Sequence, residues 1–324
     1  MPVIKQSVNL ELTNHELPKF FYDSTPCPYR QKGGSVEAEK LLQSFLNKRG
    51  ENYQFEMSSP ITAEKSCSRL STHLTYGTIS HRAVFQEATK KRDQIKHTNK
   101  NFAKSINSFL SRLHWRSHFI QKLEDQPSIE HTSFIPVYDQ IREKDEEKLE
   151  AWIEGKTGVH FIDACMIYLR NYGWINFRMR AMLASFASYN LWLDWRYFAP
   201  RLAALFTDFE PGIHYSQIQM QSGTTGINTI RMYNPYKQAM DQDPLAKFIK
   251  SQIPEVKNFP PAFFHNPPKK SLNVNLFDNE FQKEIINVKE TAQYARKKIF
   301  DIRKSQEHKI LAKNVYLKHG SRGR

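Results

Sequence analysis

The sequence predicts an all-α protein that folds as a single helical globule. Apolar side chains recur at helical spacing along most of the chain, whereas runs that alternate apolar with polar residues are scarce. Hydrophobic residues make up 40% and aromatic residues 13% of the 324 positions. This share is enough to build a substantial core and argues against general disorder.

Residues 1–34 are expected to be irregular, because they end in the turn-rich stretch STPCPYRQKGG. A helix is predicted over 35–50, with Gly50 as its C-terminal stop. One side of this helix should carry its apolar residues, namely Val36, Leu41, Leu42, Phe45 and Leu46. Residues 51–80 mix Ser, Thr, Gly and Pro, which predicts loops with short helical turns.

The stretch 100–125 predicts the clearest helix, because its apolar residues recur with a period near 3.6. Residues 146–158 and 160–173 predict a helix, a glycine turn and another helix, and the helical pattern continues over 177–209. Residues 296–324 hold ten Lys or Arg against two acidic residues. This segment fits either a solvated helix with a frayed tail or an arm that binds phosphate groups.

The chain is strongly basic, with a formal net charge of +14 and a pI near 9.5. Such a charge favours a polyanionic partner, for which nucleic acid is the leading candidate, and the alternative is a merely soluble basic surface. No glycine-rich phosphate loop of the GxGxxG or GxxxxGK[ST] type is present.

Three scattered cysteines, Cys27, Cys67 and Cys165, indicate reduced thiols in a cytoplasmic protein rather than a disulfide framework. Because no CxxC pair occurs, no structural metal site is expected. The N-terminus lacks the apolar core of a signal peptide, and no apolar stretch is long enough to span a bilayer. A protein without a membrane partner, acting as a monomer, is therefore expected.

The stretch GWINFRMRAMLASF (173–186) places Arg178 and Arg180 two residues apart in a run that should form a mostly buried helix. An arginine is almost never buried without a partner. The stretch therefore predicts an anion or a carboxylate opposite these guanidinium groups.

Five stretches between about residue 33 and residue 260 resemble, in order, motifs of the FAD-binding domain of the photolyase/cryptochrome family. CSRLSTHLTYGTIS (67–80) is similar to TSRLSPYLxxGxLS, and LHWRSHF (113–119) to LxWREFY. Residues 152–186 resemble WxxGxTGxPxVDAxMRxLxxxGWMHNRxRMxxASF. WLDWRYFAPRLAALFTDFE (192–210) and RMYNPYKQAMDQDPLAKFIKSQIPEV (231–256) resemble IDWRxGxxxFxxxLIDxD and RxFNPxxQxxxxDPxGxFIRxWxPEL.

This resemblance implies the helical fold of that family and FAD as the cofactor. It divides the chain into an N-terminal segment (1–34), the FAD-binding domain (35–270) and a basic C-terminal helical extension and tail (271–324). The family's N-terminal antenna domain is expected to be missing, because residues 1–34 are too few to build it. The chain would then be a short form, or a fragment of a longer protein.

The resemblance also implies which residues hold FAD. The loop that binds its phosphates corresponds to Cys67, Ser68, Arg69, Leu70 and Ser71, and cysteine at the usual threonine position removes a good hydroxyl donor. Arg116 corresponds to an arginine near the phosphates, with a surface salt bridge as the alternative. Four more positions are assigned to the pocket: Tyr53, Arg112, Phe119 and Phe177.

Arg180 corresponds to the family arginine that pairs with an aspartate beside the flavin, and that aspartate corresponds to Asp208. Glu210 falls at the family's second acidic position, near the ribose and adenine. His214 stands where the family has an asparagine near the flavin. It would either tune the protonation of the flavin, because the pKa of histidine lies near neutrality, or be a satisfied structural histidine.

For the substrate, the resemblance implies UV-damaged DNA whose pyrimidine dimer is flipped into the cavity. Trp115 corresponds to the tryptophan that stacks on the lesion, with ordinary helix packing as the alternative. Met182 and Met220 are assigned to the same catalytic cavity, together with His214, while Arg112 replaces an acidic residue linked to repair. Four residues are assigned to DNA phosphates: Arg178, Arg231, Lys237 and Gln238.

The family's chain of electron-transferring tryptophans is only partly retained. Trp195 corresponds to its middle member, whereas the member next to the flavin falls at Ile218. Trp174 and Trp192 are candidates for another route, and core packing is the alternative. The function expected is a blue-light DNA photolyase, that is, a carbon–carbon lyase. The alternatives are a cryptochrome-like photoreceptor and a light-independent flavin or DNA-binding module.

Overall fold

The computed structural model describes residues 26–266 and 283–320, and these residues form helices and connecting turns without a named strand. The expectations for residues 1–25, 267–282 and 321–324 lie outside the described residues. A single isolated bridge joins Glu143 and Leu193. The prediction of an all-α fold is confirmed.

The N-terminal helices pack against one long helix. They are α1 (Ser35–Ser44) with its π-helical continuation η2 (Phe45–Arg49), α2 (Tyr53–Glu56), α3 (Pro60–Ser66), α4 (Ser71–Thr75) and α5 (His81–Ile95). The long helix is α6 (Lys100–Asp125), which has the bounds that the apolar period predicts. The side chain of Asn99 caps its N-terminus by accepting a hydrogen bond from the backbone N–H of Phe102.

The middle of the chain forms a second group of helices. After the short turns η3 (Pro127–Glu130) and η4 (Pro136–Tyr138) come α7 (Glu146–Glu154), α8 (His160–Tyr172) and α9 (Phe177–Ser185). The π-helical turn η5 (Phe186–Asn190), α10 (Trp195–Ala204) and α11 (Pro211–Ser222) follow. The predicted pair of helices with a glycine turn corresponds to α7 and α8, separated at Gly155, which adopts a left-handed conformation.

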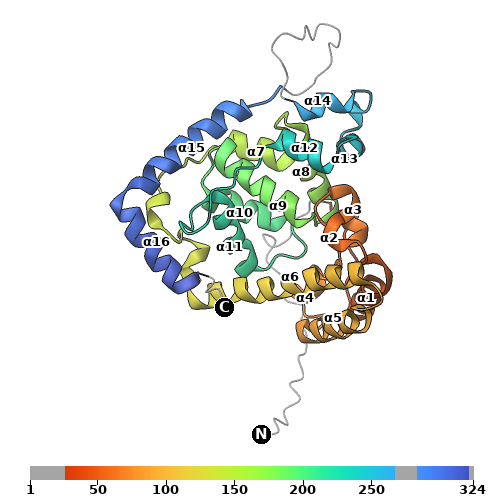
Figure 1. The fold of residues 1–324 in the computed structure, drawn as a ribbon. Coiled ribbons are helices and arrows are strands. Elements are labelled where there is room, and N and C mark those ends of the chain that lie inside the picture. Colours follow the sequence, from red (N-terminus) through yellow and green to blue (C-terminus); the bar gives the residue numbers. More distant parts are fainter. Residues whose placement is uncertain (1–25, 267–282, 321–324) are drawn as a thin grey trace, which may run out of the picture.

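The C-terminal part begins with α12 (Pro235–Gln242), α13 (Lys247–Gln252), η6 (Pro254–Val256) and α14 (Pro261–His265). It ends with α15 (Val288–Lys304) and α16 (Gln306–His319). Figure 1 shows α6 crossing the lower part of the molecule with α5 beneath it, α12–α14 at the upper right, and α15 and α16 along the left edge. The basic C-terminal segment is therefore helical over its described part.

One detail of the predicted first helix is wrong. Val36 is 66% exposed, whereas Ala38, Leu42, Phe45 and Leu46 are buried. Each residue rotates a helix by about 100°, so Val36 lies about 200° around the helix from Ala38, on the opposite side. Of these, Leu42, Phe45 and Leu46 pack toward α6 and α5 in a core with Phe102, Ile106 and Phe109.

Three groups of buried side chains make up the core. The largest lies among α7–α11 and α12–α14, the second lies among α1, α2, α5 and α6, and the third lies beneath α15 and α16. Among the described residues, no helix is long and apolar enough to cross a membrane. The long helix α6 packs against both α5 and α11. The space between the largest and the second group of buried side chains is therefore enclosed on several sides.

Candidate functional site

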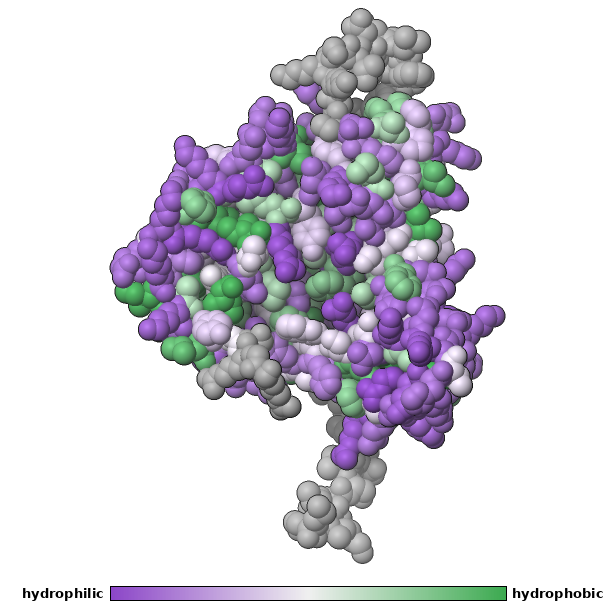
Figure 2. All heavy atoms as spheres, viewed as in Figure 1, coloured by the Kyte–Doolittle hydropathy of each residue, from purple (hydrophilic) through white to green (hydrophobic). Residues whose placement is uncertain are grey.

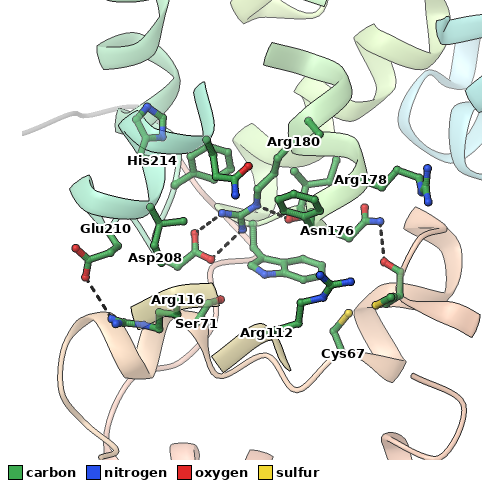
Figure 3. Close-up of a pocket in the computed structure, with 18 of the residues that line it drawn as sticks. Cys67, Ser71, Arg112, Arg116, Asn176, Arg178, Arg180, Asp208, Glu210 and His214 are labelled. Atoms are coloured by element: carbon green, nitrogen blue, oxygen red, sulfur yellow. Dashed lines mark hydrogen bonds and ion pairs between the residues drawn. The ribbon is translucent and has the colours of Figure 1, made fainter. Parts of the chain in front are cut away.

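A cavity of about 590 Å³ lies where α6, α9, α10 and α11 meet the loop before α4. This volume is typical of sites for small molecules and cofactors. Figure 2 shows a hollow near the middle of the displayed face, with more hydrophobic residues at its bottom and hydrophilic residues around it. Figure 3 shows side chains of the cavity converging from opposite elements, with Arg112 and Arg116 across from Arg178 and Arg180.

Asp208 is the partner of Arg180. Nη1 of Arg180 lies 3.0 Å from Oδ1 of Asp208, and Nη2 lies 2.9 Å from Oδ2, so the pair is bidentate (Figure 3). Nε of Arg180 donates to the carbonyl oxygen of Ile175 at 2.7 Å. The Asp208 side chain is 3% exposed. This geometry satisfies both charged groups and ties α9 to the segment that follows α10.

A second ion pair closes the opposite wall. Arg116 of α6 donates through Nη2 to Glu210 at 3.2 Å, and also to the carbonyl oxygen of Leu74 at 3.3 Å. Both side chains of the ion pair are largely buried, at 17% and 20% exposure. The contact is therefore a salt bridge in the wall of the cavity rather than one on the outer surface, and it joins α6 to the start of α11.

His214 lines the cavity from α11 and is almost completely buried. Its Nε2 lies 2.9 Å from the carbonyl oxygen of Ala199. Because a carbonyl oxygen only accepts, Nε2 carries the ring proton and Nδ1 is left as an acceptor. Burial lowers the pKa of His214 to about 4. Burial and this hydrogen bond favour the second of the two alternatives, a satisfied structural histidine, over one that titrates near neutrality.

The cavity has an excess of positive charge. Six arginines line it but only two carboxylates do, and each carboxylate already pairs with an arginine. The arginines without a carboxylate are Arg69, Arg112, Arg178 and Arg231. Nη1 of Arg69 and Nε of Arg178 are buried without a hydrogen-bond partner. A cavity with this positively charged lining favours a ligand that carries negative charge.

The lining fits FAD in both its polar and its apolar parts. The pyrophosphate of FAD brings two negative charges to a cavity with four arginines that no carboxylate neutralises. Apolar side chains such as Leu113, Trp174, Phe206 and Ile218 offer surfaces for a flat ring system. The residues present therefore fit the group that the sequence motifs imply.

The loop of residues 67–71 contributes to the cavity almost as expected. Cys67, Ser68, Arg69 and Ser71 line it, whereas the side chain of Leu70 is fully buried in the core beside α6. Burial raises the pKa of the Cys67 thiol to about 12, so this group stays protonated.

Arg69 has an unusual environment. Its φ of 62° lies in the left-handed region, and its guanidinium carbon is 3.8 Å from the centre of the Trp174 ring. Gln31 donates to the carbonyl oxygen of Arg69 at 2.8 Å. These contacts hold the strained residue in place and orient its side chain along the wall.

The structure brings most of the remaining cofactor positions together. Tyr53, Arg112 and Phe177 line the cavity. Phe119 does not, because its ring is buried on α6 and stacks on Trp115 with 5.6 Å between ring centres.

Only some of the positions assigned to substrate and DNA line the cavity. Arg178 and Arg231 line the cavity, whereas Lys237 and Gln238 lie on α12 outside it. Trp115 is 42% exposed on α6, in the same turns as Arg112 and Arg116. Two catalytic positions are not part of the cavity lining: Met182, which is fully buried, and Met220.

Of the three tryptophans assigned to electron transfer, only Trp174 lines the cavity. Trp195 is buried, and its indole N–H donates to Ser133 at 2.9 Å. The indole N–H of Trp192 donates to the carbonyl oxygen of Ile141 at 2.9 Å. Ile218, at the position of the missing tryptophan, also lines the cavity, so that part of the wall is aliphatic.

Asn176 is a site residue that the sequence did not single out. It lines the cavity, and its Nδ2 donates to the carbonyl oxygens of Met57 at 3.1 Å and Ser58 at 2.7 Å (Figure 3). Its Oδ1 is buried without a partner. The sequence feature that could have identified Asn176 is its place in the motif, next to Phe177 and Arg178.

Comparisons with known proteins show the family to which this chain belongs. Residues 109–308 match the family described as the FAD binding domain of DNA photolyase. The deoxyribodipyrimidine photo-lyase of Streptomyces griseus is 29% identical over 243 residues, which cover 75% of this chain and 50% of the relative. Cryptochrome-2 of Arabidopsis thaliana is 30% identical over 292 residues, covering 84% and 46%.

Among solved structures, the archaeal photolyase of Sulfolobus tokodaii, described with two FAD molecules, superposes with a TM-score of 0.68 at 29% identity. The match covers 87% of this chain and 59% of that chain. This chain spans about half the length of the curated relatives it matches.

The helical fold and the arginine-rich cavity define a flavin-binding domain. The chain belongs to the photolyase/cryptochrome family through its FAD-binding domain, and FAD is its cofactor.

Proposed function

We propose that this protein is a blue-light, FAD-dependent DNA photolyase, a deoxyribodipyrimidine photo-lyase that splits pyrimidine dimers by photoinduced electron transfer. The observation that carries the proposal is the cavity of a photolyase-type FAD domain whose lining keeps arginines free for further anionic groups. Relatives named as deoxyribodipyrimidine photo-lyases support it. We further expect the protein to act as a monomer in the cytoplasm.

When bound, FAD would supply the photoexcited electron donor, with the electron returning after the dimer has split. The chain's own residues would bind and orient the cofactor. The Arg180–Asp208 and Arg116–Glu210 pairs hold opposite walls at fixed positions. Neutral His214 offers an acceptor nitrogen without adding a further positive charge.

The substrate would be a dimer turned out of the DNA duplex, which costs less for a damaged base than for an intact pair. Trp115 offers an exposed ring for stacking beside the cavity. Arg178 and Arg231 would contact phosphates near the lesion, and Lys237 and Gln238 the backbone farther out. Phosphate contacts of this kind position the DNA and make binding sensitive to salt.

A cryptochrome-like photoreceptor without repair activity is the second candidate, and Arg112 favours it. This arginine lines the cavity where the family's repair members carry an acidic residue. A guanidinium donates hydrogen bonds but cannot accept one, so it cannot bind a base N–H as a carboxylate does. A relative named cryptochrome-2 is consistent with this reading.

Repair of a defined substrate separates the two candidates. Purified protein that carries flavin is reduced, mixed with oligothymidine containing cyclobutane dimers and illuminated with blue light, with a dark sample as the control. A photolyase restores the absorbance of the thymine bases in the light only. Absorbance that stays unrestored in protein loaded with reduced flavin would reject the lyase and leave the photoreceptor.

Trp115→Ala tests the assigned stacking residue. Stacking on an aromatic side chain contributes about 1–3 kcal/mol per base, so affinity for dimer-containing DNA should fall about fivefold or more while flavin content stays the same. Phe55→Ala, which removes an exposed aromatic ring of α2, is the matched control. Equal loss of flavin and DNA binding would contradict the role given to Trp115.

A further inference from the structure

Helices α15 and α16 carry a dense group of basic side chains that the FAD cavity does not use. The two helices hold nine Lys or Arg against three acidic residues. Among the described residues, only one of these nine cations forms an ion pair, Lys304 with Asp301 at 3.8 Å. The positive charge of this helix pair is therefore largely uncompensated within the described part of the chain.

The charges are not spread evenly around the two helices, because each residue turns a helix by about 100°. Positions can be counted from the buried Val288 on α15 and the buried His308 on α16. Between residues 296 and 316, the sector at about 80–160° holds cations and two aromatic rings, whereas Asp301 and Glu307 lie at about 220–260°. We call this acid-free sector the basic sector, and define it by Arg296, Phe300, Lys304, Lys309, Lys313 and Tyr316.

The basic sector lies on the face of the molecule that carries the hollow of the FAD cavity. Figure 1 shows the chain running along α15 and then α16 around the left edge, with the body of the molecule on the inner side of both helices. In right-handed helices that run in this sense, residues about 90° past the buried line turn toward the viewer. Figure 2 shows the same face, with the hollow near its middle and mainly hydrophilic residues along that edge.

The helix pair also touches the segment that carries Arg231 to the cavity. Arg303 of α15 donates through Nη2 to the carbonyl oxygen of Asn228 at 2.7 Å. A Cβ at Gly226 would lie 3.4 Å from Cβ of Ala312 on α16. Since Arg231 lines the cavity, the segment between α11 and α12 connects the basic sector to the rim of the cavity.

Two exposed aromatic rings stand among these cations. Phe300 is 56% and Tyr316 57% exposed, and the ammonium group of Lys304 lies 4.7 Å from the centre of the Phe300 ring. Cations together with exposed rings suit single-stranded nucleic acid, because the cations contact phosphates and the rings stack on unpaired bases. A basic helix that binds a lipid surface instead inserts its apolar side. Here the apolar sides of both helices are already buried in the core.

We propose that the basic sector binds an unpaired stretch of DNA next to the lesion. Its Lys and Arg side chains contact phosphates, and Phe300 and Tyr316 stack on bases. The inference rests on the proposed function in one respect, since that function places the lesion in the cavity. The sector would extend the contact with DNA beyond the cavity, so the length of strand beside the lesion affects affinity.

The salt dependence of binding to undamaged oligothymidine tests the phosphate contacts. Single strands contribute about 0.7 to the slope of log affinity against log salt for each phosphate neutralised. In full-length protein loaded with FAD, the double variant Lys309→Gln/Lys313→Gln should therefore reduce the magnitude of this slope by about 1.4, as measured by fluorescence anisotropy.

The double variant Lys100→Gln/Lys104→Gln is the matched control. It removes two exposed lysines at the same spacing, from the start of α6 at the opposite side of the molecule (Figure 1). This variant should keep the slope of the wild type. Equal slopes in the wild type and both double variants would overturn the proposal. So would unchanged DNA affinity together with binding to phosphatidylserine vesicles that Lys309→Gln/Lys313→Gln abolishes.

Tyr316→Ala and Tyr316→Phe test the stacking. Loss of the ring should lower affinity for single-stranded oligothymidine about fivefold or more, whereas phenylalanine keeps the ring and the affinity. Duplex DNA should respond much less, because its bases are already stacked. Equal affinity of the wild type and Tyr316→Ala for single strands would contradict the role of this ring.

Repair of a thymine-dimer dinucleotide separates this proposal from the proposed function. The dinucleotide has no flanking nucleotides for the basic sector to bind. Lys309→Gln/Lys313→Gln should therefore repair it at the rate of the wild type, but repair a dimer within an oligonucleotide more slowly at concentrations below saturation. If the wild type repairs neither substrate, the proposed function fails, and the slopes on undamaged strands still decide whether the basic sector binds DNA.

Discussion

Asp208 is the residue on which the charge balance of the FAD cavity depends most directly. Replacing it by Asn leaves Arg180 without its carboxylate. We expect Asp208→Asn to lower the free energy of unfolding by about 3 kcal/mol, at the low end for a broken buried ion pair because Arg180 is partly exposed. The flavin should be lost on purification. Urea unfolding and the flavin absorbance of the purified protein measure the two effects.

Asp145→Asn serves as the control for that substitution. Asp145 pairs with Lys148 at 2.7 Å on the surface of α7 and also caps this helix. Asn keeps the cap, so only a surface ion pair is removed, which contributes about 0–1 kcal/mol. Equal destabilisation by the two variants would contradict the importance assigned to the Arg180–Asp208 pair.

His214 predicts a dependence of stability on pH. Its pKa is lowered from 6.5 to about 4 by burial, so the folded state holds the ring neutral. The unfolded state therefore takes up a proton first as the pH falls. The resulting stability is fully present above about pH 6.5 and is lost as the pH falls toward 4, by about 3 kcal/mol in total.

His214→Gln should flatten this dependence, because an amide can donate to the carbonyl oxygen of Ala199 without titrating. Urea unfolding of both proteins between pH 4 and 7 measures the difference. Since His160 also has a pKa lowered to about 4, the wild type and the variant must be compared with each other. If the free energies of unfolding of the two proteins changed in parallel with pH, His214 would have the same pKa in the folded and unfolded states, and the prediction would be contradicted.

At the scale of residues, the sequence could predict a feature only where the local motif indicates it. The pairing of Arg180 with a carboxylate could be inferred, because an arginine in an apolar run requires a partner. The neutral state of His214 could not, since the burial that lowers its pKa comes from α10 and the segment after it.

At the scale of elements, the sequence predicted the helices with a regular apolar period best. α6 has the predicted bounds because its buried side chains recur on one face over the whole stretch. α5 was not predicted, since its buried residues are chiefly Val84 and Ala88 amid charged positions. The π-helical turns within predicted helices were also not predicted, because their hydrogen bonds depend on packing and not on the apolar period.

Gly173 joins two elements of the site and gives a prediction at this scale. It ends α8 with a φ of 64°, and a Cβ there would lie 2.4 Å from Cγ2 of Thr207. Thr207 bonds to the carbonyl oxygen of Gly173 and precedes Asp208. Gly173→Ala should therefore destabilise the protein by about 2–3 kcal/mol and weaken flavin binding, as measured by urea unfolding and flavin titration.

Gly77→Ala isolates the backbone part of that effect. Gly77 has a similar φ of 66°, but nothing lies within 4 Å of the position its Cβ would take. This variant should lose only about 1 kcal/mol through left-handed strain, with flavin binding unchanged. If the two variants lose equal stability, the close approach of Thr207 does not matter.

At the scale of the whole molecule, the division of the chain into an N-terminal segment, an FAD-binding domain and a C-terminal extension remains a proposal. The packing of the C-terminal helices bears on this division. The basic segment predicted as an extension forms α15 and α16, which pack on a core shared with Ile129, Phe134 and Tyr138. The described part of this segment is thus docked on the body rather than frayed. Composition alone could not predict this docking, because partners of α15 and α16 such as Ile129, Phe134 and Tyr138 lie far away in the chain.

The DNA binding that we propose should respond to salt through the phosphates that the protein contacts. Each phosphate that the protein neutralises releases counterions, so the logarithm of the affinity should fall linearly with the logarithm of the salt concentration. Arg231 lines the cavity without forming an ion pair in the part of the chain that the structure describes. We expect Arg231→Gln to reduce the magnitude of this slope by about 0.9 for duplex DNA, as measured by fluorescence anisotropy across a salt series.

Lys40→Gln gives the comparison for this slope. Lys40 lies on α1 away from the cavity and is 67% exposed, with an ion pair to Glu37 at 2.9 Å. The substitution removes the same formal charge as Arg231→Gln. If attraction by the net charge dominated binding, the two variants would change the slope alike. A smaller slope in Arg231→Gln alone would instead locate a phosphate contact at the cavity, because counterion release counts contacts and not total charge.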